Sequence, residues 1–412
     1  MQCIYFGVTG EEYVKDNIDK WITLAGVPVI FSERDSYLKN YSSKLLGKYD
    51  VISADEAIKR YPDADIWVTF RNVGWVANWL AKRISPDRIH FLEADLEYRK
   101  GCEYLGNQIL YRENSFSPCC STGQGPLVRT SGTVRQRLSL WHDYTSRLIT
   151  SVQHGGSENN CQKCHLLKTG FWRKSIKLNS FTFGVNHQTD VCNFKCIYCH
   201  SAEHLDSKKE DTGNYRLSNV LTQLSELPEY NTEELAIRFG NGEFCAYKHC
   251  DEILDIFQKT KWKMTLYSNC SIYKKQIADL MDSGRIRSLI TSLDAGTRET
   301  FKKIKQRDMF DKVVDNLRRY PTDKTSFYIK YIFLEDINDN ETEVDRFYEI
   351  AKDLNSNIIL SSNFVSPYTG KMKDLALRII TNAKSDGIKV FPDTTYVQSA
   401  DSKFIQESYA NA

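Results

Sequence analysis

From residue 178 to residue 395, strand-like and helix-like segments alternate regularly, and this alternation constrains the fold more than any other feature. Apolar stretches with the length of buried strands are separated by segments with helical periodicity. The expected strands are 180–186, 234–241, 264–269, 286–294, 326–335, 357–364 and 388–392. About six βα units with short connections favour a parallel sheet that forms a barrel or partial barrel. In such a barrel the functional groups lie at the carboxyl ends of the strands.

Three cysteines, Cys192, Cys196 and Cys199, follow the first of these strands in the sequence CNFKCIYC. A structural zinc site closes with four protein ligands, and a disulfide framework uses cysteines in pairs. The C-x3-C-x2-C spacing instead suits a [4Fe–4S] cluster in which one iron has no protein ligand. A zinc knuckle with His200 as the fourth ligand is the alternative, and it leaves the motifs on the later strands unexplained.

Four motifs, in order along the expected strands, resemble those of the radical S-adenosylmethionine (radical SAM) enzymes over residues 180–395. They are CNFKCIYC, FGNGEF, YSN and SLDAGTRETFKKI. The resemblance implies a partial (β/α)6 barrel in which Cys192, Cys196 and Cys199 ligate a [4Fe–4S] cluster, and the open iron chelates S-adenosylmethionine. It also implies that a reductase, a flavodoxin or a ferredoxin donates an electron. Cleavage of S-adenosylmethionine then gives a 5′-deoxyadenosyl radical, which abstracts hydrogen from a small-molecule substrate.

The resemblance also assigns cofactor contacts to residues of these motifs. Tyr198 is expected near the adenine, and Gly242 and Glu243 are expected to contact the methionyl amino group. The residues expected to bind the ribose or the methionyl carboxylate are Ser268, Asn269, Ser292, Asp294 and Lys330. A zwitterionic cofactor needs a carboxylate for its ammonium group and cationic or hydroxyl groups for its carboxylate.

Simpler interpretations of the same residues stay open. Glu243 could be a solvated carboxylate at a strand end, and Lys330 could be a surface lysine. Ser292 and Asp294 could cap the following helix without binding a ligand. The motif also departs from the family pattern: Asn241 stands at the usual first glycine, and Phe244 stands where proline is common. Cys270 follows the Ser-Asn pair where glycine is frequent.

Residues 1–107 repeat the strand–helix alternation on a smaller scale and predict a Rossmann-like parallel α/β domain. The turn from Gly7 to Gly10 could cradle a phosphate, but Glu11 and Glu12 follow it, and a plain tight turn is the alternative. The barrel is expected at 178–395, and residues 396–412 are expected to form a polar, frayed tail.

Residues 108–177, between the small domain and the barrel, form a cysteine-rich insert. The insert carries the pair Cys119–Cys120 and the C-x-x-C pair Cys161–Cys164. Together these four cysteines could hold a second Fe–S cluster or a zinc ion. Free buried cysteines are the alternative.

Composition limits the classes of partner. A formal net charge of +2 gives no global attraction to nucleic acids or to acidic membranes. No stretch of about 18 apolar residues is present, so no membrane span is expected. The amino terminus has no basic segment followed by an apolar stretch, and twelve cysteines without an export signal indicate a reducing, cytoplasmic location.

The substrate is the least constrained part of the prediction. Residues 1–107 loosely resemble nucleotide-sugar-binding domains, and the whole arrangement resembles proteins of bacterial surface-polysaccharide pathways. The leading interpretation is therefore epimerisation or dehydrogenation of a sugar or nucleotide-linked sugar. The alternatives are a cobalamin-dependent radical methyltransferase, a peptide-modifying maturase, and a non-enzymatic Fe–S sensor or scaffold. The absence of cysteines after Cys270 disfavours the maturase, since many maturases carry a cysteine-rich extension there.

Overall fold

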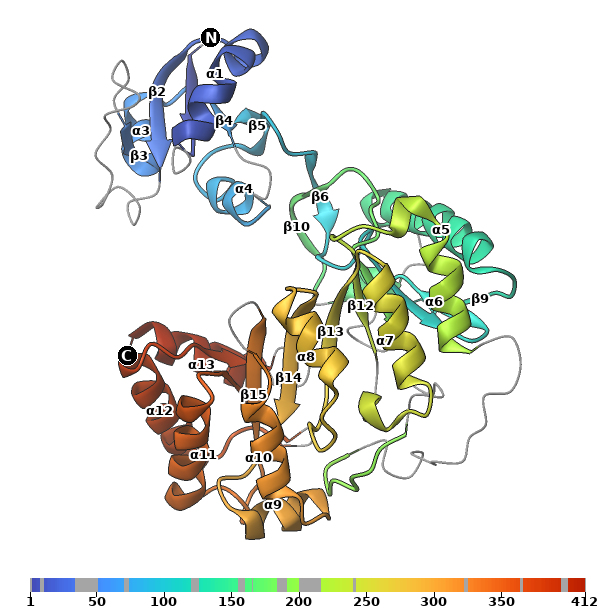
Figure 1. Cartoon of the computed structure of the whole chain (residues 1–412). Helices are drawn as coiled ribbons and strands as arrows, with labels where there is room; N and C mark the ends of the chain where they lie inside the picture. Colours follow the sequence, from blue (N-terminus) through green and yellow to red (C-terminus); the bar gives the residue numbers. More distant parts are fainter. Residues whose placement is uncertain are drawn as a thin grey trace. The chain divides into compact units, whose positions relative to one another are not determined.

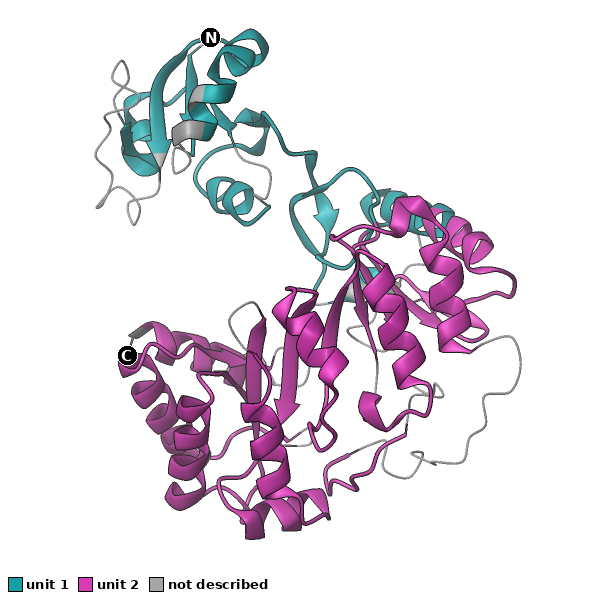
Figure 2. Ribbon diagram, in the orientation of Figure 1, with its two compact units in different colours: residues 1–106, 143–177 teal, residues 107–142, 178–412 magenta. Residues whose placement is uncertain are grey.

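The chain forms two compact units, which Figures 1 and 2 show in a computed structural model. Unit 1 contains residues 1–106 and 143–177, and unit 2 contains residues 107–142 and 178–412. The cysteine-rich insert predicted at 108–177 is therefore divided between the two units. The structure describes residues 2–7, 11–33, 51–69, 74–119, 126–154, 160–164, 166–183, 191–199, 216–239, 242–321, 325–363, 366–393 and 399–411.

Unit 1 is built on a parallel sheet of five strands in the order β3-β2-β1-β4-β5. The strands are β1 (Cys3–Phe6), β2 (Pro28–Glu33), β3 (Val51–Ser53), β4 (Asp65–Val68) and β5 (Ile89–Phe91). The helices beside it are α1 (Glu11–Ala25), α3 (Ala54–Arg60), α4 (Gly74–Leu80) and the short η1 (Pro86–Arg88). Alternate residues of β1 point to opposite faces. Ile4 and Phe6 pack with α3 and α4, whereas Cys3 and Tyr5 pack with Trp21 of α1.

A two-stranded antiparallel ribbon completes unit 1. It pairs β6 (Leu96–Gly101) with β10 (Lys168–Arg173), so the two sequence segments of the unit are joined by strand hydrogen bonds. The short helix η2 (Asn160–Lys163) precedes β10, and the long helix α5 (Val134–His154) crosses the boundary between the two units in sequence.

Unit 2 is built on a sheet of ten strands in the order β17-β16-β15-β14-β13-β12-β11-β7-β8-β9. The strands before the barrel region are β7 (Gln108–Arg112), β8 (Ser115–Ser117) and β9 (Val128–Arg129). The remaining strands are β11 (Ser180–Phe183), β12 (Ala236–Arg238), β13 (Lys263–Tyr267), β14 (Ile286–Ser292), β15 (Ser326–Phe333), β16 (Asn357–Ser362) and β17 (Val390–Pro392). From β11 to β17 every neighbouring pair is parallel and follows chain order, as the sequence predicts.

Helices connect these parallel strands (Figure 1). They are α6 (Leu217–Ser225), α7 (Cys250–Lys259), α8 (Lys275–Asp282), α9 (Arg298–Lys305), α10 (Phe310–Arg318), α11 (Glu341–Asp353), α12 (Gly370–Ser385) and α13 (Ser399–Asn411), with the short η3 (Pro228–Tyr230) and η4 (Phe244–Ala246). Because βαβ crossovers are right-handed and each strand lies beside the next, the connecting helices cover one face of the sheet. The α/β class with parallel sheets is confirmed, and a Rossmann-like domain and a partial barrel stay predictions.

The two faces of the unit 2 sheet differ in chemistry. Phe239, just after β12, contacts Phe183 and the α7 residue Phe257, so these side chains lie on the helix-covered face. Arg238 precedes Phe239 and points to the opposite face, called here the inner face. The strand register continues this face to Ser292 of β14 and Lys330 of β15. The inner face is therefore polar near the carboxyl ends of the strands.

The carboxyl-terminal segment is a packed helix, and the prediction of a frayed tail at 396–412 is wrong. Helix α13 packs against α12 and β17. Its Ile405 is buried, and the carboxylate of Asp401 accepts a hydrogen bond from the Tyr368 N–H (3.1 Å). The Tyr409 hydroxyl also donates to the Ile388 carbonyl (3.1 Å), so apolar and polar contacts together hold this helix. Among the described helices, none has the length and apolarity needed to cross a bilayer.

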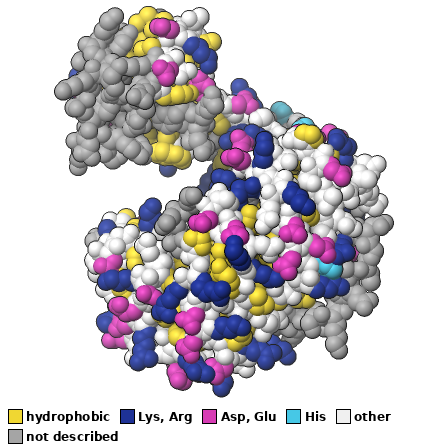
Figure 3. Space-filling view, in the orientation of Figure 1, with side chains coloured by type: hydrophobic (Ala, Val, Ile, Leu, Met, Phe, Trp, Pro, Cys, Tyr) yellow, Lys and Arg dark blue, Asp and Glu magenta, His cyan; other side chains and the backbone are white. Residues whose placement is uncertain are grey.

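The surface of unit 2 carries charges of both signs. On the face drawn in Figure 3, Lys and Arg side chains lie beside Asp and Glu side chains over the helices. Ion pairs on these helices include Lys275–Asp279 (2.8 Å), Arg298–Asp308 (2.7 Å), Arg318–Asp353 (2.9 Å) and Arg378–Asp345 (2.6 Å). Among the described residues of this face, charges of both signs are therefore interspersed.

Candidate functional site

The loop 191–199 carries the three clustered cysteines and begins shortly after β11. Cys192, Cys196 and Cys199 are all half-buried. The Cys192 sulfur accepts hydrogen bonds from the Phe194 N–H (3.4 Å) and from Asn269 Nδ2 (3.8 Å). Burial, with smaller contributions from Glu243 and the neighbouring cysteines, raises the pKa of the Cys192 thiol to about 12.

These thiols have the chemistry that an Fe–S cluster requires. Three sulfur donors lie on one short loop, and N–H groups are directed at the first of them, as is typical of cluster sulfurs. Cluster loading must remove the thiol protons that burial favours. Within the described ranges, no three His, Cys, Asp or Glu side chains are gathered closely enough to hold a metal ion. Ligation by Cys192, Cys196 and Cys199 therefore stays a prediction.

The cysteine loop is docked on the carboxyl end of helix α9. The Lys195 N–H donates to the Lys305 carbonyl (3.2 Å), and the Ile197 N–H donates to the Ile304 carbonyl (3.0 Å). The last carbonyls of a helix have no partner inside the helix. The loop supplies donors for two of them, so its backbone is fixed beside α9.

Asn193 of the cysteine loop is hydrogen-bonded to the segment that follows β13. The Asn269 Nδ2 donates to Asn193 Oδ1 (2.8 Å), and Asn193 Nδ2 donates to Ser271 Oγ (2.8 Å). Asn269 Oδ1 accepts from the Ser271 N–H (3.0 Å), which closes the network. Asn269, predicted as a cofactor contact, therefore lies against the loop with its amide group already hydrogen-bonded.

Glu243 is completely buried and forms the centre of a second network. Its Oε1 accepts from the Cys245 N–H (3.0 Å) and from Ser268 Oγ (2.8 Å), and its Oε2 accepts from the Asn269 N–H (2.5 Å). Burial raises its pKa, although these hydrogen bonds act to lower it. No Lys, Arg or His of the described chain forms an ion pair with it. Glu243 is thus not a solvated strand-end carboxylate. In the described part of the chain, only neutral groups donate hydrogen bonds to its carboxylate.

Gly242 and Glu243 bring the second motif to the cysteine loop. Gly242 has a φ of +92°, a conformation that residues with a Cβ rarely adopt. The Glu243 N–H donates to the Val191 carbonyl (2.7 Å), next to Cys192. The structure therefore brings the predicted amino-group contacts together with the predicted cluster loop. Asn241 lies outside the described residues.

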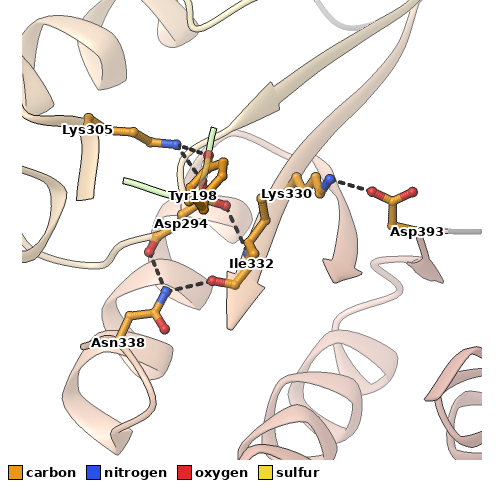
Figure 4. Close-up of polar contacts among 7 residues, drawn as sticks. All are labelled: Tyr198, Asp294, Lys305, Lys330, Ile332, Asn338 and Asp393. Atoms are coloured by element: carbon orange, nitrogen blue, oxygen red, sulfur yellow. Dashed lines mark hydrogen bonds and ion pairs between the residues drawn. The ribbon is translucent and has the colours of Figure 1, made fainter. Parts of the chain in front are cut away.

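Asp294 is surrounded by hydrogen-bond donors from several elements, as Figure 4 shows. It is fully buried with a φ of +59°. Its Oδ1 accepts from the Ile332 N–H (2.9 Å), and its Oδ2 accepts from the Tyr198 hydroxyl (2.5 Å) and pairs with Lys305. The Asn338 side chain donates to its carbonyl (2.8 Å). These donors enclose the carboxylate, and a cofactor contact by Asp294 stays a prediction.

Tyr198 was predicted near the adenine, and it lines a cavity. The cavity has a volume of about 230 Å³, and Ile197, Phe333, Leu334 and Met372 are among its other walls. The Tyr198 hydroxyl is held by Asp294 and Lys305, which leaves the ring as the contact surface. A planar apolar group would find aromatic and aliphatic walls here.

Lys330 is buried and paired, so it is not a surface lysine. Its ammonium group forms an ion pair with Asp393, which follows β17 (Figure 4). Ser292, at the end of β14, is its register partner. The two predicted contacts therefore lie side by side on the inner face. Ser268 is a third predicted contact. Its hydroxyl donates a hydrogen bond to Glu243 and accepts one from the Cys270 N–H (3.0 Å).

Two cations near the site were not found from the sequence. Lys305 is buried against Asp294, but nothing in the pattern FKKIK distinguishes it from the exposed Lys302 and Lys303. Arg238 is half-buried on the inner face, and its buried Nε has no hydrogen-bond partner among the residues that the structure describes. An arginine inside the apolar stretch LAIRF is the signal that could have identified it.

The predicted second metal site lies on residues of both units and stays a prediction. Cys119 belongs to unit 2, whereas Cys161 and Cys164 belong to unit 1. The Cys164 N–H donates to the Cys161 carbonyl (3.0 Å), which gives the C-x-x-C segment a tight turn. Cys120 lies outside the described residues, as do His200 and residues 8–10 of the predicted phosphate turn.

Comparisons with known proteins show which sequences and structures the chain is similar to. The model of the Radical SAM superfamily matches residues 187–348. A probable GTP 3′,8-cyclase of Methanocella arvoryzae is 31% identical over 181 residues, which are 43% of this chain and 55% of that protein. A GTPase Obg of Brachyspira hyodysenteriae is 30% identical over 175 residues, which are 40% of this chain and 25% of that protein. The chain thus spans between a quarter and about half of these relatives.

Among solved structures, Streptococcus suis SuiB bound to S-adenosylmethionine is similar, with a TM-score of 0.38 and 12% identity. The match covers 63% of this chain and 59% of SuiB. A radical SAM methyltransferase from Sphaerobacter thermophilus matches with a TM-score of 0.35 and 15% identity, over 49% of this chain and 63% of that one.

Proposed function

The chain carries a radical SAM enzyme domain, whose cofactors are a [4Fe–4S] cluster and S-adenosylmethionine, and on this premise we propose that Cys192, Cys196 and Cys199 ligate the cluster. The observation that carries the proposal is the hydrogen bond from the Glu243 N–H to the Val191 carbonyl (2.7 Å). It places a buried, cation-free carboxylate directly beside the cysteine loop. A sheet of the partial (β/α)6 type would present both at the carboxyl ends of its strands.

When bound and reduced by a reductase, a flavodoxin or a ferredoxin, the cluster supplies the electron that converts S-adenosylmethionine to methionine and a 5′-deoxyadenosyl radical. The residues of the chain bind and orient S-adenosylmethionine. Glu243 accepts the methionyl ammonium, which compensates its buried charge. Tyr198 and the apolar walls beside it receive the adenine ring. Ser292 and Lys330 lie where the inner face could bind the methionyl carboxylate.

The inner face also supports an anionic substrate. Arg238 is a half-buried cation with no carboxylate partner in the described part of the chain, two strands from Ser292 along the same face. Guanidinium groups bind phosphate and carboxylate in bidentate geometry. A phosphate-bearing substrate, such as a nucleotide-linked sugar undergoing epimerisation or dehydrogenation, would satisfy this arginine. The Methanocella relative, whose name refers to GTP, is consistent with a nucleotide. A role in polysaccharide biosynthesis stays part of this proposal.

The function is tested by the release of 5′-deoxyadenosine. Anaerobically reconstituted protein is incubated with S-adenosylmethionine and dithionite, and the product is quantified by chromatography. We expect release from the wild type and none from the variant in which Cys192, Cys196 and Cys199 are all replaced by alanine. A variant with Cys250→Ala, a buried thiol outside the loop, is the matched control. Equal release by the triple variant would overturn the proposal.

The substrate class is tested with Arg238→Met. We expect calorimetry with UDP-glucose and with GTP to give at least tenfold weaker binding of whichever nucleotide the wild type binds, because a charge-assisted contact is lost. Arg287→Met, which removes an exposed arginine on β14, is the control. Equal affinity in Arg238→Met, or no binding of either nucleotide or of pyrophosphate to the wild type, would refute an anionic substrate at Arg238.

A further inference from the structure

A buried ion pair lies next to the cysteine loop (Figure 4). The side chains of Lys305 and Asp294 are 2% and 0% exposed, and they contact each other directly. Lysine is almost never buried unless it is paired. Removing two charges from water costs several kcal/mol of desolvation free energy per ion. An apolar contact could hold the loop without this cost. The position of the ion pair suggests a use for the charges.

The pair reaches the loop through Tyr198. Lys305 Nζ donates to the Tyr198 hydroxyl (2.7 Å) and lies 5.0 Å from the centre of the Tyr198 ring. The same hydroxyl donates to Asp294 Oδ2 (2.5 Å). Tyr198 lies between Cys196 and Cys199 in the sequence, so both charges are held against the segment that carries two of the three thiols.

The backbone holds the same elements together. The Lys195 N–H donates to the carbonyl of Lys305 (3.2 Å), and Phe194 contacts Phe301 of α9 with ring centres 5.8 Å apart. The Ile332 N–H holds the second oxygen of Asp294 (2.9 Å). These contacts hold the backbone of Lys305 and the carboxylate of Asp294 beside the loop, and the bonds of Lys305 Nζ to Tyr198 and Asp294 hold the ammonium group there.

We infer that Lys305 and Asp294 act in opposite directions on the reduction potential of the cluster. The inference rests on the proposed function, because it needs a cluster on Cys192, Cys196 and Cys199. Reduction adds one negative charge to the cluster. A nearby cation stabilises the reduced state and a nearby anion destabilises it, and both effects are strong where water is excluded. In the wild type the two contributions largely offset each other.

The test measures the midpoint potential of the reconstituted cluster by a redox titration followed by electron paramagnetic resonance, with the iron content measured in parallel. We expect Lys305→Met to lower the potential, because Asp294 then acts unopposed. The expected change is at least tenfold in the ratio of reduced to oxidised cluster, which is 59 mV for a one-electron couple. Asp294→Asn should raise the potential by a similar amount.

Three further variants separate charge from packing. The double variant Lys305→Met/Asp294→Asn carries neither charge and should return towards the wild-type potential. Lys305→Arg keeps the cation and should stay near the wild type. Lys303→Met removes an exposed lysine from the same helix, where solvent screens its charge, and should change nothing. A purely structural pair would lower the iron content without shifting the potential in opposite directions.

The possible outcomes are distinct. A wild-type protein that holds no cluster and releases no 5′-deoxyadenosine would refute the proposed function. A wild type with a reducible cluster, combined with unchanged potentials in Lys305→Met and Asp294→Asn, would overturn this inference alone. Shifts of both variants in the same direction would also overturn it. If Lys305→Met does not retain the cluster, the potential of Asp294→Asn still decides, since it must rise.

Discussion

Three carboxylates of unit 2 are largely withdrawn from solvent, and their partners decide what each can do. Asp294 is paired with Lys305, and Asp393 is paired with Lys330. Glu243 has three neutral donors and no cation within the described part of the chain. A buried charge without a counter-ion is costly. A cationic ligand group would therefore gain most by binding at Glu243.

Glu243→Gln tests this residue. The amide keeps the size of the side chain. Its NH2 group, however, replaces a carboxylate oxygen that accepts a hydrogen bond in the wild type. We expect a loss of about 1–3 kcal/mol in the free energy of unfolding, because a buried donor is left unsatisfied. The affinity for S-adenosylmethionine should fall about tenfold or more. Calorimetry and chemical denaturation measure the two effects, with the exposed Glu299→Gln as control. Unchanged affinity with an intact cluster would mean that the ammonium binds elsewhere.

The pH dependence of stability gives an independent test of Glu243. Burial raises its pKa above the ordinary value of 4.5, so the folded protein keeps a proton that the unfolded chain has lost. The contribution of this group to the free energy of unfolding is therefore fully present below pH 4.5, and it falls as the pH rises to the folded-state pKa. Denaturation of the cofactor-free protein should show this fall in the wild type and not in Glu243→Gln. The same pH dependence of the free energy of unfolding in the wild type and in Glu243→Gln would contradict the raised pKa of Glu243.

At the scale of elements, local pattern predicts the strands well and predicts side-chain roles poorly. Each expected strand from 178 onward is present. Hydrophobic periodicity and β-branched residues indicate a strand within a few residues of sequence, so no distant contact is needed to recognise it. The enclosure of Asp294 was not predicted, because it depends on Lys305 and Ile332, which are brought to it only by folding. The same reason explains why Lys305 was missed. The tail helix α13 was missed because its sequence is polar, and its contacts, such as those of Ile405 and Tyr409, form only on folding.

The turn before helix α9 offers a prediction at this scale. A Cβ built on Gly296 would lie 2.2 Å from the Glu343 carbonyl oxygen and 2.8 Å from the Phe347 nitrogen, so backbone would have to move. We expect Gly296→Ala to lower the free energy of unfolding by about 3 kcal/mol or more, by analogy with severe overpacking. Gly370→Ala meets nothing within 4 Å and should be neutral or slightly stabilising. Equal denaturation midpoints for the two variants would show that α9 is not held this tightly.

At the scale of the whole molecule, the chain consists of two units with separate cores. The core of unit 1 includes Trp21 and Phe6, and the proposed cofactor site lies entirely in unit 2. We expect two transitions in scanning calorimetry. S-adenosylmethionine should raise the temperature of only the transition that belongs to unit 2, because a ligand stabilises the unit that binds it. Trp21→Ala should lower only the other transition. A single transition that shifts in both experiments would indicate that the units unfold together.

The central claim is that the cluster on the cysteine loop has an iron open to S-adenosylmethionine. The most direct measurement is electron–nuclear double resonance on the reduced cluster with S-adenosylmethionine labelled with ¹⁵N at the amino group and ¹⁷O at the carboxylate. Direct chelation predicts hyperfine coupling from both labels in the wild type, weakened in Glu243→Gln. A reduced cluster that binds the labelled cofactor but shows no coupling would contradict the account, because the fourth iron would then have a different ligand.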